Sequence, residues 1–166
     1  PVIYAANLDE DGMMNLDTNA NFAALKKIAD EQGAAVLPVA AKFEEDIAGM
    51  EPDEAEMFMA DLGLTETGLD RLIKTSYDLL GYISFLTAGE DDVHAWTITR
   101  GTKAPKAAGK VHSDIERGFI RAEIVAFDDL KACGSMTAAK EKGLLRLEGK
   151  DYVMQDGDIT NFRFNI

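Results

Sequence analysis

The 166 residues are 46% hydrophobic and carry a formal net charge of −13, with one cysteine and two histidines. This composition predicts a globular chain with a substantial core, and it excludes a membrane-spanning helix because no run of about 18 apolar residues occurs. Cys133 cannot form an intrachain disulfide, and His94 and His112 lack the spacing of a zinc site, so we expect a cytoplasmic protein without a metal site.

Charge divides the chain into two parts. Residues 1–80 contain 17 acidic and 5 basic residues, which gives −12, whereas residues 81–166 contain 13 acidic and 12 basic residues, which gives −1. Because exposed charges are screened beyond about 8 Å at physiological salt, an acidic part does not cancel a basic surface elsewhere. Together with a change of pattern at Gly81, this predicts two domains, 1–80 and 81–166, with different partners.

The first predicted elements form a β-α-β unit. Residues 2–7 (VIYAAN) are a continuous apolar run, typical of a strand buried on both faces, and residues 34–41 (AAVLPVAA) are a second one. Helical spacing over 22–29 predicts a crossover helix that Gly33 ends. The unit predicts two parallel strands of an incomplete α/β sheet. Since the chain starts at Pro1 directly on an apolar strand, we expect that upstream sequence supplies further strands.

Three helices are predicted next, over residues 42–49, 52–62 and 67–80. Pro52 suits a first helical turn, and Thr67 with Asp70 resembles a capping box. Helical periodicity in the third segment predicts one apolar face packed in the core. That face contains Leu69, Leu72, Ile73, Ser76, Tyr77 and Leu80.

Beyond Gly81 the pattern changes to short alternating strands. The alternation predicts one strand with Ile120, Ala122, Ile124 and Ala126 on one face, and a last strand with Phe162, Phe164 and Ile166 on one face. Short helices are predicted over 111–116, 128–132 and 137–141, Trp96 and Phe119 are expected in the core, and residues 156–158 (DGD) are expected to form a turn. The second domain is thus an α+β unit with a small mixed sheet.

A candidate ligand site follows the first strand. Asn7, Leu8, Asp9 and Glu10 come where the carboxyl ends of strands bind ligands in open α/β sheets. The amide of Asn7 can donate and accept hydrogen bonds, and the carboxylate of Glu10 can accept them from the N–H groups of a planar base. The residues also suit a simple turn, and the pattern alone leaves both roles open.

A second candidate site is the stretch of residues 100–121, which carries +4 inside an acidic protein. We expect its basic side chains on glycine-punctuated loops suited to phosphate backbones. Pairing with acids nearby in space is an equally open alternative. For His112, a structural hydrogen-bonding role is favoured over pH sensing or catalysis. The basic residues are Arg100, Lys103, Lys106, Lys110, Arg117 and Arg121.

Several motifs in the second half carry a family resemblance. HAWTI (94–98), RGTKAP (100–105), AGKVH (108–112), DIERGFIRAE (114–123), EGKDYV (148–153) and DGD (156–158) resemble the TGS domain of the YchF/Obg-like ATPase family, and the resemblance extends over nearly the whole chain. It implies that residues 81–166 form a ubiquitin-like β-grasp (TGS) domain that associates with the ribosome or RNA. It also implies that residues 1–80 are the C-terminal part of a P-loop nucleotide-binding domain, in other words a partial P-loop-type α/β sheet with helices.

The resemblance assigns roles to the first site. Asn7 to Glu10 form the N-x-x-E that the family carries in place of the N-K-x-D of other GTPases, a change associated with relaxed guanine preference and use of ATP. By that resemblance, Asn7 and the backbone of Leu8 contact the base of ATP or GTP, and Glu10 helps shape the pocket. Ala40 and Ala41 supply a backbone edge of the same pocket.

No G-x-x-x-x-G-K-[ST] motif occurs in the 166 residues. We therefore expect that this chain alone has no catalytic residues and does not hydrolyse nucleotide, and that Mg²⁺ is bound only in a full-length protein.

The leading interpretation is the C-terminal portion of a YchF-like protein that binds and hydrolyses ATP or GTP and docks on the ribosome or RNA through its basic residues. The alternative is a stand-alone β-grasp adaptor that binds RNA or protein. The incomplete sheet is expected to leave strand edges that can pair with another copy.

Overall fold

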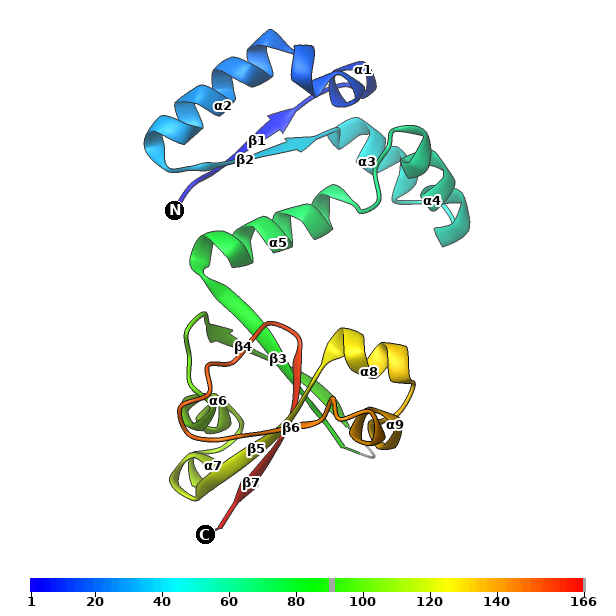
Figure 1. The fold of residues 1–166 in the computed structure, drawn as a ribbon. Coiled ribbons are helices and arrows are strands. Elements are labelled where there is room, and N and C mark those ends of the chain that lie inside the picture. Colours follow the sequence, from blue (N-terminus) through cyan, green and yellow to red (C-terminus); the bar gives the residue numbers. More distant parts are fainter. Residues whose placement is uncertain (90–91, 166) are drawn as a thin grey trace. The chain divides into compact units, whose positions relative to one another are not determined.

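The computed structural model describes residues 1–89 and 92–165, and the chain divides into two compact units, residues 1–80 and 81–166 (Figure 1). None of the helices in the described ranges has the length and apolar character needed to cross a membrane.

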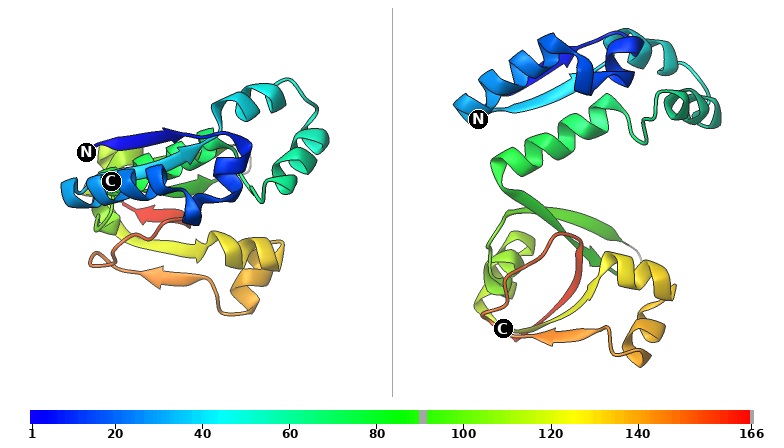
Figure 2. Two further views of the ribbon diagram at one scale, coloured as in Figure 1. Left: turned by 90° about the horizontal axis from the view of Figure 1, so that it is seen from above. Right: turned by 45° about the horizontal axis from the view of Figure 1, so that its top comes forward.

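The first unit is a parallel strand pair with helices. Strands β1 and β2 pair from Ile3 beside Ala35 to Asn7 beside Val39. Helix α2 contacts both strands and α5 contacts β2, so that the two helices lie on opposite sides of the pair (Figure 1, Figure 2). The elements are β1 (Ile3–Asn7), α1 (Glu10–Met14), a 3-10 turn η1 (Leu16–Thr18), α2 (Ala20–Gln32), β2 (Ala35–Val39), α3 (Ala41–Ile47), α4 (Pro52–Asp61) and α5 (Gly68–Leu80).

Local signals set the ends of these helices, and the stop at Gly33 is where the sequence predicted it. The side chain of Asn19 accepts a hydrogen bond from the Phe22 amide at 3.0 Å and caps α2, which ends at Gly33 with a φ of 63°. Before α5, the Asp70 amide donates to Thr67 Oγ1 at 3.1 Å, and the Thr67 amide donates to Asp70 Oδ2 at 3.3 Å. These reciprocal bonds confirm the predicted capping box.

Burial in the first unit is lower than predicted. Within β1 and β2 only Ala6 and Leu37 are buried, so the prediction of strands buried on both faces is wrong for the other positions. The reason is that these two strands have no further strand neighbours within residues 1–89 and 92–165, so that they are covered only where α2 and α5 lie against them.

The apolar face of α5 is also exposed, contrary to the predicted core packing. Leu69, Leu72, Ile73 and Leu80 leave 65%, 40%, 50% and 49% of their surface exposed. The only buried residue of α5 is Gly68, which lies outside the predicted face. Periodicity identified an amphipathic helix correctly, but amphipathicity alone does not say which face finds a partner.

The second unit is built on a five-stranded mixed sheet with the order β4-β3-β7-β5-β6. Strands β3 and β7 are parallel, and all other neighbours are antiparallel. Its elements are β3 (Tyr82–Ala88), β4 (Val93–Thr99), α6 (Ala104–Val111), α7 (Ser113–Arg117), β5 (Phe119–Ala126), α8 (Phe127–Cys133), α9 (Met136–Glu141), β6 (Arg146–Glu148) and β7 (Asp158–Phe164).

Both faces of this sheet bury apolar side chains. Phe85 and Ile124 pack with α6 in one cluster, whereas Val125 and Ile159 pack with α8 and α9 in another. Because successive side chains of a strand point to opposite faces, Ile124 and Val125 serve the two clusters from adjacent positions. The predictions that Phe119 is buried and that Trp96 packs against the core are confirmed.

A register shift changes part of the predicted alternation. The pairing of β5 with β7 is irregular between Phe119 and Arg121, so Phe119 takes the inward position and Ile120 leaves 49% of its surface exposed. Phe164, near the end of the sheet, is 41% exposed. The predicted face of Ile120 is therefore wrong, whereas Phe164 shares the face of Phe162 by strand alternation, as predicted, and Ile166 lies outside the described residues.

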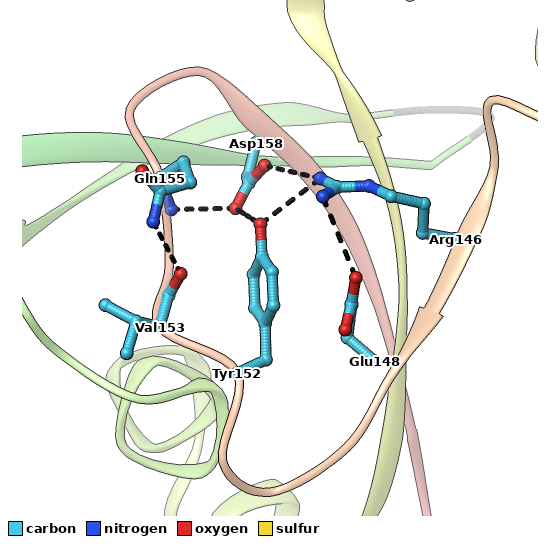
Figure 3. Close-up of polar contacts among 6 residues, drawn as sticks. All are labelled: Arg146, Glu148, Tyr152, Val153, Gln155 and Asp158. Carbon is cyan, nitrogen blue, oxygen red and sulfur yellow. Dashed lines mark hydrogen bonds and ion pairs between the residues drawn. The ribbon is translucent and has the colours of Figure 1, made fainter.

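A buried carboxylate anchors the loop that precedes β7 (Figure 3). Asp158 is 2% exposed, and its Oδ2 accepts hydrogen bonds from the Tyr152 hydroxyl at 2.9 Å and the Gln155 amide at 2.8 Å. Arg146 Nη2 lies 3.5 Å from the other oxygen. Burial and the bond to Asp158 raise the pKa of Tyr152. Gly157, with a φ of 77°, forms the predicted turn.

Candidate functional site

The first candidate site lies where β1 and β2 end together. In this parallel pair Asn7 is registered beside Val39, and the Leu8 amide donates to the Val39 carbonyl at 2.8 Å. The Ala41 amide then donates to Asn7 Oδ1 at 3.1 Å. Two residues 34 positions apart are thereby joined at the carboxyl edge of the strands, where open α/β sheets bind ligands.

Helix capping sets the position of Glu10. Asp9 precedes α1, and its Oδ1 accepts a hydrogen bond from the Gly12 amide at 2.8 Å. A Cβ atom at Gly12 would lie 2.9 Å from that oxygen and 3.2 Å from the Leu8 Cβ. Gly12 therefore lets the first turn of α1, which begins with Glu10, close tightly against the end of β1.

A hollow of about 250 Å³ opens beside these strand ends. Three predicted residues, Leu8, Glu10 and Ala40, line it, and the hydrogen bond between Asn7 and Ala41 ties its two walls together. We call it the strand-end pocket. Four further lining residues were given no predicted role, namely Asp9, which lies within the predicted segment, and Asp11, Lys42 and Phe43.

Sequence position could have found these four. Asp9 and Asp11 flank Glu10 in one helical turn, and Lys42 and Phe43 open the helix that follows the second strand. The apolar part of the wall comes from Phe43, which is 7% exposed.

The donor and acceptor groups fit a planar, uncharged ligand. Asn7 Oδ1 is already occupied by the Ala41 amide, which leaves the Nδ2 group as a donor. The carboxylates of Asp9, Glu10 and Asp11 offer acceptors and repel anions. A flat heteroaromatic group with N–H donors suits this lining, whereas a phosphate does not.

The second candidate site is largely helical, and the prediction that its basic residues lie on loops is wrong for Lys106, Lys110, Arg117 and Arg121. Lys106 and Lys110 lie within α6, and Lys103 is its N-cap residue. Spacings of three and four residues place these lysines on one exposed face. The opposite face holds Ala104, Ala107 and Ala108, which are buried under the sheet. Arg117 is in the last turn of α7.

The glycines of this stretch serve packing within the chain. A Cβ atom at Gly109 would lie 2.1 Å from Glu116 Oε2, so the glycine permits close approach of α6 and α7. At Gly118 a Cβ atom would lie 2.1 Å from the carbonyl oxygen of Asn165. Helix α6 escaped prediction because a mid-helix glycine lowers helix propensity, while contacts with the sheet stabilise the helix.

Half of the six basic residues in this stretch form ion pairs with acidic side chains. Lys103 Nζ lies 2.8 Å from Asp151 Oδ1, and Lys106 Nζ lies 2.5 Å from Glu116 Oε1. These exposed pairs fit the alternative of a solvated, mixed-charge face. Lys103 lowers the pKa of Asp151 through a hydrogen bond.

Arg117 is paired as well, with Asp114, and its hydrogen bond lowers the pKa of that carboxyl. Over residues 1–89 and 92–165, Lys110 and Arg121 make no ion pair.

Two of the six predicted residues lie apart from the α6 face. Arg121 is in β5 beside Ala122, which packs in the cluster with α6, so strand alternation directs Arg121 to the other side of the sheet. Arg100 is in the turn after β4, where its amide donates to the Gly81 carbonyl at 2.7 Å. We define the α6 basic face as Lys103, Lys106, Lys110 and Arg117.

His112 has the predicted structural role. Its Nδ1 accepts a hydrogen bond from the Asp114 amide at 3.2 Å and caps α7. In the part of the chain that the structure describes, no three His, Cys, Asp or Glu side chains gather as metal ligands would.

Comparisons with known proteins agree with one another. Residues 82–165 match the family model YchF-GTPase_C, described as a protein of unknown function (DUF933). Over 166 residues the chain is 52% identical to the ribosome-binding ATPase YchF of Bacillus subtilis and 47% identical to that of Pasteurella multocida, covering 100% of this chain and 45% of each relative. The chain spans about half the length of the curated relatives it matches.

A solved structure extends this similarity to the fold. The YchF GTPase of Schizosaccharomyces pombe superposes with a TM-score of 0.80 at 36% identity, covering 98% of this chain and 43% of that chain. The mixed α/β architecture of both units is thus similar to that of a YchF structure.

Proposed function

Since the chain belongs to the YchF family, we propose that it forms part of a cytoplasmic ATPase or GTPase that associates with the ribosome. Residues 1–80 contribute the base-binding edge of a P-loop nucleotide-binding domain, and residues 81–166 form a TGS domain. The names of the relatives support the ribosome and ATP as partners.

The observation that carries the nucleotide proposal is the hydrogen bond from the Ala41 amide to Asn7 Oδ1. It holds the ends of β1 and β2 around the strand-end pocket, and it leaves the Asn7 amide nitrogen to donate to a base. In our proposal Leu8, Ala40 and Ala41 supply backbone and apolar walls, and Glu10 accepts from an N–H group of ATP or GTP.

The topology of the second unit supports the β-grasp assignment. Its first and last strands, β3 and β7, are parallel neighbours in the middle of the sheet, and antiparallel strands flank them. Helices α6 and α7 cross between the two halves of the sheet and pack on one face.

We propose that the 166 residues alone do not hydrolyse nucleotide. They contain no glycine-rich phosphate-binding motif, and the acidic lining of the strand-end pocket does not suit phosphate. Phosphate binding, Mg²⁺ and the catalytic groups then belong to a full-length protein.

Base recognition is tested by Glu10→Asp in a full-length protein that contains these residues. We expect the ratio of ATP to GTP affinity to shift toward GTP, because a shorter carboxylate restores the pattern of guanine-reading GTPases. Competition between labelled ATP and unlabelled GTP measures the ratio. Glu45→Asp, an exposed change on α3 outside the pocket, is the control. An unchanged ratio in Glu10→Asp contradicts a base-reading role.

For docking, we propose that the α6 basic face contacts ribosomal RNA, with Arg100 and Arg121 as further contacts. Its lysines share one exposed helix face, where each neutralised phosphate adds salt-dependent affinity. Because three of the face's basic groups are exposed and paired with acidic side chains, binding requires exchange of these weak pairs for phosphates.

The docking test is the triple variant Lys103→Glu, Lys106→Glu and Lys110→Glu in a sedimentation assay with ribosomes across a salt series. We expect weaker association and a flatter salt dependence. The matched control is Lys131→Glu, Lys140→Glu and Lys142→Glu, which makes the same charge change at exposed positions of α8, α9 and its end. Equal binding of the α6 variant and the wild type favours the alternative, an adaptor that binds protein and whose basic face is incidental.

We further propose that the isolated chain self-associates through its incomplete sheet. The pair β1–β2 has no further strand neighbours among the described residues, and α5 exposes Leu72 and Ile73 beside it. Sedimentation velocity should show dimers or larger species that Leu72→Glu with Ile73→Glu reduces. A monomer at all concentrations contradicts this proposal.

A further inference from the structure

A second hollow, of about 400 Å³, lies in the first unit between α1, α3 and α4. We call it the three-helix groove. Its size is within the range of about 300–1,000 Å³ that is usual for ligand pockets. The apolar lining residues are Phe43, Ile47, Met50, Phe58 and Leu62.

The groove has firm walls and an apolar surface. Phe43 and Ile47, both buried, belong to the cluster that packs α1, α3 and α4 together, with Met50 and Leu62 against it. Phe58 leaves 44% of its surface exposed. An aromatic side chain so exposed in a hollow gains most when a partner covers it.

Each of the three helices adds one carboxylate to the lining. Glu10 comes from α1, Asp46 from α3 and Asp61 from α4. Over the described ranges, Glu10 and Asp61 make no ion pair. Asp46 reaches only Lys42, at 3.9 Å, and both of these side chains are more than half exposed.

The surrounding sequence strengthens this negative charge. Residues 41–61 contain eight acidic residues and one basic residue. A surface of this sign repels nucleic acid, phosphate and anionic lipid. It attracts cationic partners, and the apolar lining requires that such a partner also carry apolar side chains.

We propose that the three-helix groove docks a short basic amphipathic segment of a partner protein. Apolar side chains spaced three and four residues apart in that segment cover Phe58 and Met50, and its lysine or arginine side chains pair with Glu10, Asp46 and Asp61. The argument for this docking does not rest on the proposed nucleotide and ribosome contacts, but Glu10 and Phe43 line both the groove and the strand-end pocket, so a partner in the groove and a base in the pocket share these two residues.

The chain's own basic helix does not fit this occupant. In α6 the lysines are exposed, but Ala104, Ala107 and Ala108 are buried in the core of the second unit. A second copy could therefore offer charge to the groove but no apolar side chains from α6.

The test uses the whole 166-residue chain and a fluorescent 14-residue peptide of leucine and lysine, with leucines spaced to form one helical face. Anisotropy titrations should show saturable binding that weakens with salt. We expect at least a tenfold loss of affinity in Asp46→Asn with Asp61→Asn, and again in Phe58→Ser. Chemical shift changes on the labelled wild-type chain should centre on α3 and α4 (Figure 1).

A matched control separates the groove from general attraction to an acidic unit. Asp53→Asn with Glu56→Gln makes the same charge change on exposed positions of α4 outside the groove, and Met57→Ser removes a side chain that is 71% exposed there. These variants should bind the peptide like the wild type. Equal losses in groove and control variants overturn the proposal.

Two further outcomes also overturn it. One is equal binding of a peptide with the same composition but leucines distributed around the helix. The other is an RNA oligonucleotide that displaces the peptide from the groove. If the helical circular dichroism signal of Phe58→Ser is reduced, the variant has lost structure and its binding no longer tests the groove. The test then rests on Asp46→Asn with Asp61→Asn, because both residues are exposed and their amide replacements disturb no buried contact.

Discussion

The two units differ in how completely they cover their apolar side chains. In the second unit a five-stranded sheet buries clusters on both faces, and Phe85 and Ile124 are fully buried. In the first unit a strand pair supports one small cluster around Met13 and Phe43, while α5 exposes Leu72. The α6 basic face therefore rests on a sheet with apolar clusters on both faces, whereas the strand-end pocket rests on helix caps and on the end of one strand pair, which the hydrogen bond between Asn7 and Ala41 closes.

From this comparison we expect the largest loss of stability when a core side chain of the second unit is truncated. Phe85→Ala removes a ring that packs edge-on against Phe162 at a centroid distance of 5.8 Å, and we expect a loss of about 3–5 kcal/mol. Urea unfolding followed by the fluorescence of Trp96, the only tryptophan, reports on this unit. Leu72→Ala, at an exposed position of the first unit, should change stability by no more than about 0.5 kcal/mol. Similar losses in both variants would remove the contrast between the units.

The next largest loss of stability is expected when the buried carboxylate of Asp158 is removed. Asp158→Ala leaves the Tyr152 hydroxyl, the Gln155 amide and Arg146 without their acceptor, so we expect a loss of about 3 kcal/mol. Tyr152→Phe removes the two hydrogen bonds of its hydroxyl, to Asp158 and from Arg146, but leaves the carboxylate in place, and should destabilise by about 1 kcal/mol. Denaturant midpoints with unchanged slopes measure both. An equal effect of the two variants contradicts a central role for Asp158.

A smaller loss of stability is expected where two backbone segments of the second unit approach each other closely. Gly118→Ala would place a Cβ atom 2.1 Å from the Asn165 carbonyl oxygen, which is backbone and cannot rotate away. We expect a loss of about 1–3 kcal/mol. Gly149→Ala, where no atom lies within 4 Å of the new Cβ, is the control and should be near neutral. Thermal unfolding of both variants compares them.

The smallest effect concerns an exposed pair on α7. Arg117 lowers the pKa of Asp114, so the stabilisation by its carboxylate is present above the ordinary pKa of Asp and is lost as the pH falls through the lowered value. Asp114→Asn should lower Tm by a few degrees at most near pH 6. The difference from the wild type should vanish toward about pH 2. A difference that grows on acidification would show that another group is responsible.

Prediction from the sequence succeeded where the signals are local. Gly33 ends α2, and Thr67 with Asp70 starts α5, because caps and glycine turns act within a few residues. The candidate residues Leu8, Glu10 and Ala40 were also identified from strand ends and family motifs, and the structure brings them to one pocket.

Prediction from the sequence failed where contacts between residues far apart in the chain determine the structure. Helix α6 contains Gly109 and is stabilised by buried alanines against the sheet, which local propensity does not reveal. The shift beside Phe119 depends on pairing with β7, and the exposure of Leu69 depends on which partner surface is present. The acidic partner of Lys103 is Asp151, which lies 48 residues further along the chain.

By itself, the sequence determined most of the element types outside α6, the family, and the division of charge between an acidic first part and a nearly neutral second part. Only the tertiary structure decided that Asn7 meets Ala41, that the lysines of α6 share a face separate from Arg121, and that three acidic helices enclose the three-helix groove. The physical reason is that periodicity and capping act over one or two turns, whereas pockets and charged faces arise from side chains that only long-range packing brings together.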